Sequence, residues 1–161
     1  MEYQEYFDKS EEHKDKIAAT FKRLKKKKPK GLDDLFQDAH EKAFEEIDCL
    51  KCANCCKTTS PIFRDIDIKR ISKKMKVSSR DFESNYLRRD EDDDWVLKTS
   101  PCAFLIDDNT CGIYDYRPQA CVDYPHTNQR KVVQVLDLTL KNTEICPAAA
   151  KISLEITQHI G

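Results

Sequence analysis

Four of the chain's eight cysteines lie within eight residues, in the stretch CLKCANCC between Cys49 and Cys56. The spacing Cys-x-x-Cys wraps two thiolates around one metal ion in zinc ribbons and fingers. A buried apolar cysteine is the simple explanation for any single thiol, but not for eight of them in one chain of this length. The cysteines therefore constrain the fold more than any other feature. All eight are candidate metal ligands: Cys49, Cys52, Cys55, Cys56, Cys102, Cys111, Cys121 and Cys146.

The spacing leaves the kind of metal centre open. Three cysteines at three-residue intervals also bind a [4Fe–4S] cluster in ferredoxin loops, where a fourth cysteine followed by proline arrives separately, as in Cys146-Pro147. The adjacent Cys55 and Cys56 suit two different metal ions, or one ligand and one spare thiol, because neighbouring side chains tend to project apart. The pattern predicts a compact polymetal site or two neighbouring sites, holding zinc, iron or an iron–sulfur cluster.

Metal binding is favoured over disulfides and over thiol redox chemistry. The first residues, MEYQEYFDKSEEHKDK, are acidic and polar, unlike a secretory signal, and no apolar run approaches the about 20 residues of a membrane helix. We therefore expect a cytoplasmic protein, in which thiols stay reduced. A thioredoxin-like site would need a βαβ pattern around its Cys-x-x-Cys motif, and the sequence shows none.

A Zn²⁺ ion bound by four thiolates has a net charge of −2, so nearby cations should compensate this charge. Lys51, Lys57 and Arg117 are the candidates by position, and Pro118 fixes the backbone directly after Arg117. The simpler explanation for Arg117 is a surface position or an ion pair. His126 is the histidine near the cysteines and is a candidate for an alternative ligand or proton carrier, against a plain surface histidine.

The composition predicts a small domain with a lean core. The chain has 161 residues, of which 39% are hydrophobic and 35% charged, so a cross-link such as a metal would help it to fold. Pattern and turn signals predict a mostly α-helical protein with a small β-hairpin (α+β), irregular and organised by metal. We expect an N-terminal charged helical hairpin over 1–45 and a cysteine-cluster domain with a C-terminal helix over 46–161.

Several elements follow from apolar periodicity. We expect one long charged helix over 3–28, with its apolar stripe at Ile17, Phe21 and Leu24, and an acidic helix over 32–47. Two short helices should follow the cysteine cluster. CAFLIDDNTCGIY should form the hairpin. The tail that starts at RKVVQV should begin as either a strand or a helix and should end as a helix from about Ala148.

The basic run Lys22–Lys30 is the strongest charge feature and could bind RNA, an acidic lipid surface or an acidic protein. The simpler explanation is a solvated helix end that pairs with the acidic helix after it. No aromatic residues interleave with the lysines as a stacking platform for nucleic acid would require, which argues against nucleic acid.

CLKCANCC followed by PCAFLIDDNTCGIYDYRPQACVDYP resembles the CxxCxxCC, or YkgJ-type, family of cysteine-cluster proteins over roughly residues 46 to 147. The resemblance implies zinc or iron chelation by all eight cysteines, with Arg117, Pro118 and Pro125 at recurrent non-cysteine positions. Some larger relatives are flagellin lysine N-methylases, which use S-adenosylmethionine. The present chain has only three glycines and no Gly-rich loop after a strand, so this activity is not carried over directly.

Three hypotheses follow. The leading one is a metal-binding protein whose eight cysteines chelate zinc or an iron centre that organises the fold. The second is an iron–sulfur-dependent protein lysine methylase-like enzyme, which would bind S-adenosylmethionine. The third is an adaptor in which metal only staples the fold and Lys22–Lys30 binds a protein partner.

Overall fold

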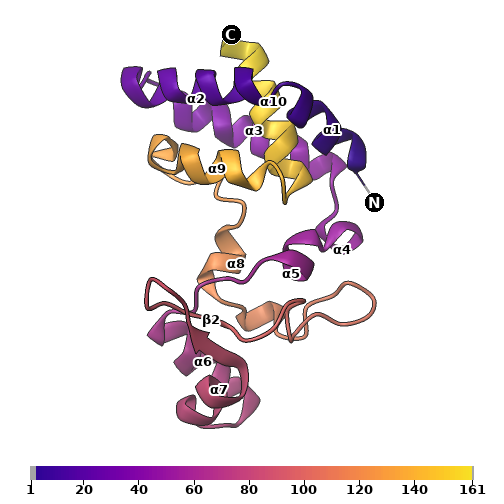
Figure 1. Ribbon diagram of the computed structural model, residues 1–161, viewed down its shortest axis with the longest axis vertical. Helices are drawn as coiled ribbons and strands as arrows, with labels where there is room; N and C mark the ends of the chain where they lie inside the picture. The colour runs from indigo at the N-terminus through magenta and orange to yellow at the C-terminus, as the bar shows by residue number, and fades with distance from the viewer. Residues whose placement is uncertain (1–2, 161) are drawn as a thin grey trace. The chain divides into compact units, whose positions relative to one another are not determined.

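The computed structural model describes residues 3–160 and is mostly helical, with one two-stranded antiparallel sheet in this range (Figure 1), which confirms the predicted fold class. The chain forms two compact units. Unit 1 combines Met1–Cys52 with Pro125–Gly161, and unit 2 is Ala53–Tyr124. The division into domains at residue 46 stays a prediction. Over residues 3–160, none of the helices combines the length and the apolar character needed to cross a membrane.

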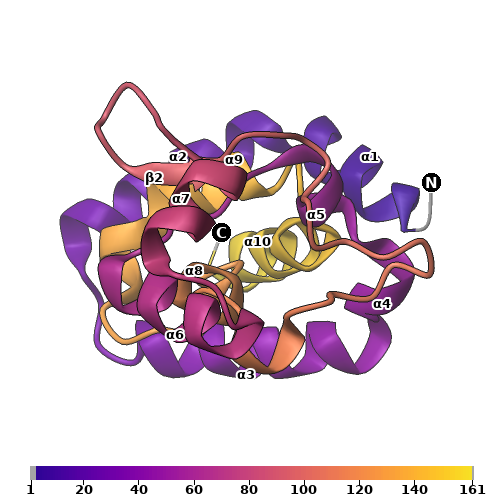
Figure 2. The same ribbon diagram turned by 90° about the horizontal axis from the view of Figure 1, so that it is seen from below.

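Unit 1 is a helical bundle around its last helix. Its helices are α1 (Gln4–Glu12), α2 (Lys14–Lys27), α3 (Leu32–Glu46), α4 (Cys49–Cys52), the 3₁₀ helix η2 (Val132–Val135), α9 (Leu136–Asn142) and α10 (Pro147–Ile160). Helix α10 packs on α1, α2, α3 and α9, and in Figure 2 it runs through the middle of these helices. Its inner face is made of small and branched side chains that are fully buried: Ala148, Ala149, Ala150, Ile152 and Ile156.

The N-terminal helix differs from the prediction of one helix over 3–28. It is interrupted at His13, whose φ of −106° and ψ of 14° leave the helical region. Helix α1 packs on α10, whereas α2 packs on both α9 and α10, so the interruption lets each segment keep its own partner. The buried stripe Ile17, Phe21 and Leu24 belongs to α2 alone, as expected.

The other helices of unit 1 agree with the predicted elements, but the predicted ion pairing does not form. Helix α3 agrees with the predicted acidic helix, and the tail is helical throughout α9 and α10, with Pro147 in the first turn of α10. The expected ion pairing between α2 and α3 does not occur among the described residues, where Lys25 pairs instead with Asp137 of α9 at 2.7 Å. The apolar faces of α2 and α3 do meet, through Phe21 and Phe36.

Unit 2 contains α5 (Asn54–Thr58), α6 (Asp65–Met75), α7 (Ser79–Tyr86), β1 (Leu87–Arg89), β2 (Trp95–Leu97), the 3₁₀ helix η1 (Tyr114–Tyr116) and α8 (Gln119–Asp123). Helices α6 and α7 are the two short helices that the sequence predicts. Ser78 caps α7 by accepting the N–H of Asp81 at 3.0 Å. The buried core of this unit consists of Phe63, Ile68, Ile71, Phe82, Leu87, Leu97, Phe104 and Ile113.

The β-hairpin lies elsewhere than predicted. Strands β1 and β2 pair on either side of the acidic loop 90–94, in which the Asp90 side chain accepts the N–H groups of Asp92 and Asp94 and so forms the turn. The predicted hairpin in CAFLIDDNTCGIY is reduced to one isolated bridge between Leu105 and Cys111. Hydrogen bonds from the Ile106 N–H to the Thr110 carbonyl and from the Gly112 N–H to the Phe104 carbonyl, both at 2.8 Å, flank this bridge, and the Cys102 N–H donates instead to the Cys56 carbonyl at 2.7 Å.

Candidate metal centre

Four thiols of unit 2 come from four separate segments. Cys56 lies on α5, Cys102 follows β2, Cys111 lies at the isolated bridge, and Cys121 is on α8. Burial, together with the charges of the other three sulfurs, raises the pKa of Cys121 to about 12. The four thiols are therefore close enough to affect one another's ionisation.

The backbone fixes several of these segments. The 2.7 Å hydrogen bond from the Cys102 N–H to the Cys56 carbonyl joins two of the cysteine-bearing segments directly. Hydrogen bonds from Ile106 to Thr110 (2.8 Å) and from Gly112 to Phe104 (2.8 Å) close the loop that holds Cys111. Since Cys102 and Cys111 also pack against the apolar core, the position of the thiols depends on the folding of unit 2.

Backbone N–H groups point at some of the sulfurs. Burial raises the pKa of Cys102, and the N–H groups of Phe104 and Leu105 oppose this rise. Burial likewise raises the pKa of Cys111, and the N–H of Ile113 opposes it. A donor to sulfur favours the thiolate, which is the form that binds metal. Sequence reasoning missed these donors, although each lies two or three residues after its cysteine.

Cys55 and Cys56 interact with each other. The Cys55 thiol hydrogen bonds to the Cys56 sulfur and lowers the pKa of Cys56 to about 7, while burial opposes the shift. The two adjacent sulfurs therefore meet, contrary to the expectation that their side chains project apart. Cys56 is the most readily ionised thiol of its cluster, since burial raises the pKa of Cys102, Cys111 and Cys121.

Unit 1 holds a second set of thiols. Cys49 and Cys52 lie on α4, and Cys146 directly precedes α10. Burial is the main cause that raises the pKa of Cys146 to about 12; the charges of Cys49 and Cys52 act in the same direction, and the N–H groups of Ala149 and Ala148 in the first turn of α10 oppose it. The three thiols are thus near one another, and the N-terminus of α10 favours the thiolate of Cys146.

Arg117 is the predicted cation that acts on the thiols. Its charge lowers the pKa of Cys111 and Cys121, against the larger opposite effect of burial. The guanidinium lies 4.0 Å from the centre of the Tyr114 ring, and its Nη1 donates to the Tyr114 carbonyl at 2.8 Å. This contact fixes a positive charge beside two candidate ligands.

The other non-cysteine candidates are Lys51, Lys57 and His126. Lys51 and Lys57 are exposed, and His126 is half-buried in unit 1 with a left-handed backbone (φ 67°). Their roles in metal binding stay predictions.

The thiols are gathered but do not form a ready-made coordination sphere. All eight cysteines are free of disulfide bonds. Across residues 3–160, no three histidine, cysteine, aspartate or glutamate side chains lie close enough to hold a metal ion as they stand. Thiols alone make up each set, and this donor type suits zinc and iron–sulfur centres rather than magnesium or calcium.

The comparisons with known proteins agree with this donor chemistry. A family model named CxxCxxCC, described as "Putative zinc- or iron-chelating domain", matches residues 48–147. No curated protein and no solved structure shows significant similarity to the chain. The matched segment is more than half of the chain and includes all eight cysteines, so the chain belongs to the CxxCxxCC family of cysteine-cluster domains.

Proposed function

We propose that the protein binds zinc or iron at two thiol sites. Cys56, Cys102, Cys111 and Cys121 form the site of unit 2, and Cys49, Cys52 and Cys146 form the site of unit 1. The single observation that carries the proposal is the mutual influence of four thiols from four separate segments of unit 2. Buried neutral thiols do not stabilise one another, so their clustering alone does not stabilise the fold. A metal ion bound by all four thiolates would make the same clustering favourable.

The two sets suit different kinds of site. Four thiolates complete a tetrahedral zinc site, which is the arrangement of structural zinc, and Arg117 offsets part of its net negative charge. The unit 1 set would supply three thiolates, from Cys49, Cys52 and Cys146, and would leave room for a further ligand. Three protein ligands with an open position are typical of reactive metal sites.

Metal binding in unit 2 would also organise the fold. The cysteine-bearing segments between residues 98 and 124 contain little regular structure, so ligand bonds replace the ladder hydrogen bonds that the segments lack. Structural zinc can supply about 10 kcal/mol or more to a small domain. Chelation should therefore loosen unit 2 and lower its melting temperature.

The test uses two serine variants of the full chain, purified under reducing and anaerobic conditions. Cys121→Ser should remove one metal equivalent and Cys146→Ser another, because each belongs to a different thiol set. Val122→Ser, at the exposed residue beside Cys121, is the matched control and should keep the full metal content. Protein without metal, or unaffected by chelators, contradicts the proposal. Loss of all metal in both variants contradicts the division into two sites.

The same preparation identifies the metal. Iron with acid-labile sulfide and visible absorption would show an iron–sulfur protein, and S-adenosylmethionine binding would then test the methylase-like alternative. Colourless protein with stoichiometric zinc would show a structural zinc protein.

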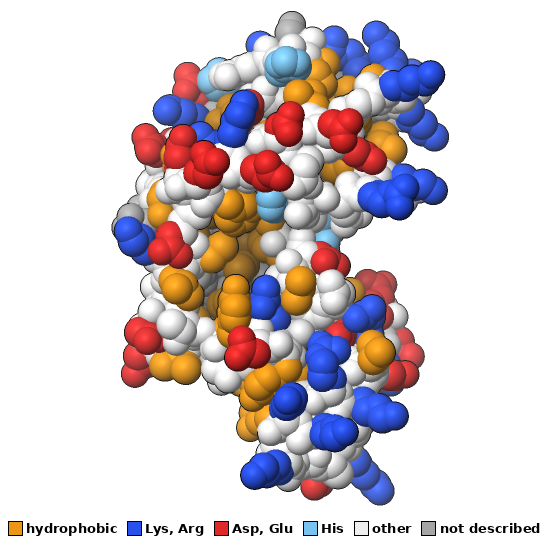
Figure 3. Space-filling model, turned by 180° about the vertical axis from the view of Figure 1, so that it is seen from behind, with side chains coloured by type: hydrophobic (Ala, Val, Ile, Leu, Met, Phe, Trp, Pro, Cys, Tyr) orange, Lys and Arg blue, Asp and Glu red, His pale blue; other side chains and the backbone are white. Residues whose placement is uncertain are grey.

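A second candidate function is an adaptor that binds an acidic protein partner through Lys22–Lys30. Apart from Leu24, these residues are exposed, and Lys25, Lys28 and Lys30 line an open hollow of about 780 Å³ together with Lys131. In Figure 3, basic side chains are gathered on the helices of unit 1 and, separately, over α6 and α7 of unit 2. Lys28→Glu with Lys30→Glu should weaken binding to a polyglutamate probe and leave metal content unchanged. Unchanged probe binding contradicts the adaptor.

A further inference from the structure

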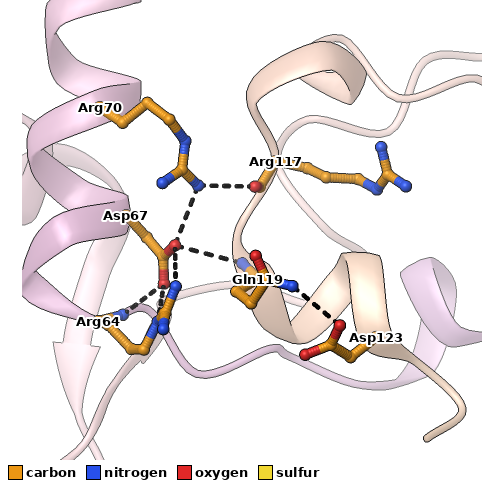
Figure 4. A network of polar contacts seen from close by, with 6 residues as sticks. All are labelled: Arg64, Asp67, Arg70, Arg117, Gln119 and Asp123. Atoms are coloured by element: carbon orange, nitrogen blue, oxygen red, sulfur yellow. Dashed lines mark hydrogen bonds and ion pairs between the residues drawn. The ribbon is translucent and has the colours of Figure 1, made fainter. Parts of the chain in front are cut away.

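Asp67 is a buried carboxylate that the metal chemistry does not use. Its side chain is 0% exposed on the inner face of α6. It accepts five hydrogen bonds (Figure 4): three from Arg64 (N, Nε and Nη2, at 2.9, 3.1 and 3.2 Å), one from Arg70 Nη2 (3.0 Å) and one from the Gln119 N–H (3.2 Å). Burial disfavours the charge, but these donors outweigh it and lower the pKa of Asp67 to about 2. The group is therefore an anion whose lone pairs are occupied, which makes it a poor metal ligand.

The donors fall into a local and a distant group. Arg64 precedes α6 and completes its capping box with Asp67, so its bonds stabilise the start of the helix. The Gln119 N–H, in contrast, belongs to the segment that leads to Cys121. Arg70 connects the two groups, because its Nη2 donates both to Asp67 and to the Arg117 carbonyl at 2.9 Å.

Both peptide groups around Pro118 are consequently held by α6. The Arg117 carbonyl lies on one side of this buried proline and the Gln119 N–H on the other. Proline has no N–H of its own and a fixed φ, here −58°, so these two bonds leave the segment little freedom. Figure 4 shows the segment beside α6, with the Arg117 side chain directed away from Asp67.

Cys121 depends on this segment for its position. It lies on α8, which has only five residues and begins at Gln119, and its N–H donates to the Pro118 carbonyl at 2.9 Å. A helix this short is not stable by itself. The location of α8 must therefore come from the contacts that hold its first residues. The same contacts fix the backbone of Arg117, from which the guanidinium group extends.

We propose that Asp67 is a positioning residue for the unit 2 metal site: with Arg70 it holds both sides of Pro118 on α6 and so places Cys121 and Arg117 beside the other three thiols. The inference rests on the proposed function of those thiols. It goes beyond it by assigning a task to an ion-pair network that contains no ligand. Hydrogen-bonded groups behind metal ligands typically change metal affinity by about 10- to 100-fold.

The test compares two arginines that pair with the same carboxylate. Arg70→Gln removes the connection to the Arg117 carbonyl, whereas Arg64→Gln removes only the local pair at the helix start. Reduced full-length variants are titrated with Co²⁺, whose d–d absorption reports the geometry of a thiolate site, and zinc affinity is measured by competition with a chelator. Arg70→Gln should shift the d–d bands and weaken one site about 10-fold or more. Arg64→Gln should keep the wild-type spectrum and affinity, even if it unfolds at lower denaturant.

A second pair removes the charge itself. Asp67→Asn should reproduce the spectral change of Arg70→Gln, and Asp65→Asn, an exposed position on the same helix, should not. If Arg70→Gln and Asp67→Asn bind cobalt as the wild type does, or if Arg64→Gln changes the spectrum equally, the positioning role is refuted while metal binding stands. If the wild type itself takes up no cobalt, the proposed function fails instead.

Discussion

Replacing Phe82 by alanine should unfold unit 2 selectively. The Phe82 ring is 0% exposed and meets three aromatic rings, with centroid distances of 6.1 Å to Phe63, 5.2 Å to Tyr86 and 6.1 Å to Phe104. A buried Phe→Ala change costs about 3–5 kcal/mol, and loss of three aromatic pairs places Phe82→Ala near the upper limit. An isolated domain of this size holds only about 4–10 kcal/mol, so the variant loses a large share of the stability of unit 2.

The assay is hydrogen exchange of the full chain, read separately for each unit. About 4 kcal/mol corresponds to about a thousandfold faster exchange, because each 1.4 kcal/mol is tenfold. Protection should therefore fall about a thousandfold in α6, α7 and β2, and much less in α10. Phe36→Ala is the matched control, since Phe36 is equally buried but lies in unit 1.

Two results would refute this reasoning. Equal loss of protection in α6 and α10 would show that the two units unfold as one. Unchanged protection in unit 2 would show that its aromatic core contributes little. Because Cys102 and Cys111 pack against the same core, Phe82→Ala should also weaken zinc binding, and Phe82→Leu, which keeps most of the volume, should do so less.

Three further changes probe local features. Burial lowers the pKa of His40, although the charge of Glu41 opposes this effect. The unfolded chain therefore binds the proton more readily, and stability should fall as the pH drops below about 6.5. Urea unfolding of His40→Gln should depend less on pH than that of the wild type, and an equal dependence would contradict this prediction. Ser78→Ala removes the cap of α7 and should cost about 1 kcal/mol, seen as faster exchange in α7 with α6 little changed. Gly31→Ala should cost about 1 kcal/mol in urea unfolding, because φ is +80° while the space around the new methyl is open; a neutral result would show that this turn relaxes.

Local patterns predicted the helices well where an apolar stripe and a stop signal coincide. Helix α3 was predicted from its apolar spacing, and the helix that ends the tail was predicted close to where α10 lies. The interruption at His13 was not predictable from the sequence, since it depends on which helices α1 and α2 pack against. The hairpin was misplaced because β-prone residues at 102–114 suggested strands, whereas the Asp90 turn that forms the actual hairpin looked like a solvated acidic loop.

The site was predictable in composition but not in arrangement. The cysteine spacing predicted a pool of candidate ligands, and sequence position predicted Arg117 as a neighbouring cation, whose charge acts on Cys111 and Cys121. It could not show that Cys146 belongs with Cys49 and Cys52, because that association comes from the packing of α10 in unit 1. Asp67 was also missed, since it is one of two aspartates in the first turn of a charged helix, and only the fold brings the Gln119 N–H to it.

The discontinuous make-up of unit 1 has a consequence for the chain as it leaves the ribosome. All of unit 2 is synthesised before the first residue of α10, so α1, α2 and α3 still lack the helix that they surround when the synthesis of unit 2 is complete. At 5–20 residues per second, the interval between residue 124 and residue 160 lasts about 2–7 s. During that interval the apolar stripes of the first helices stay uncovered on the nascent chain, which makes this period the time at which a chaperone would have most to bind.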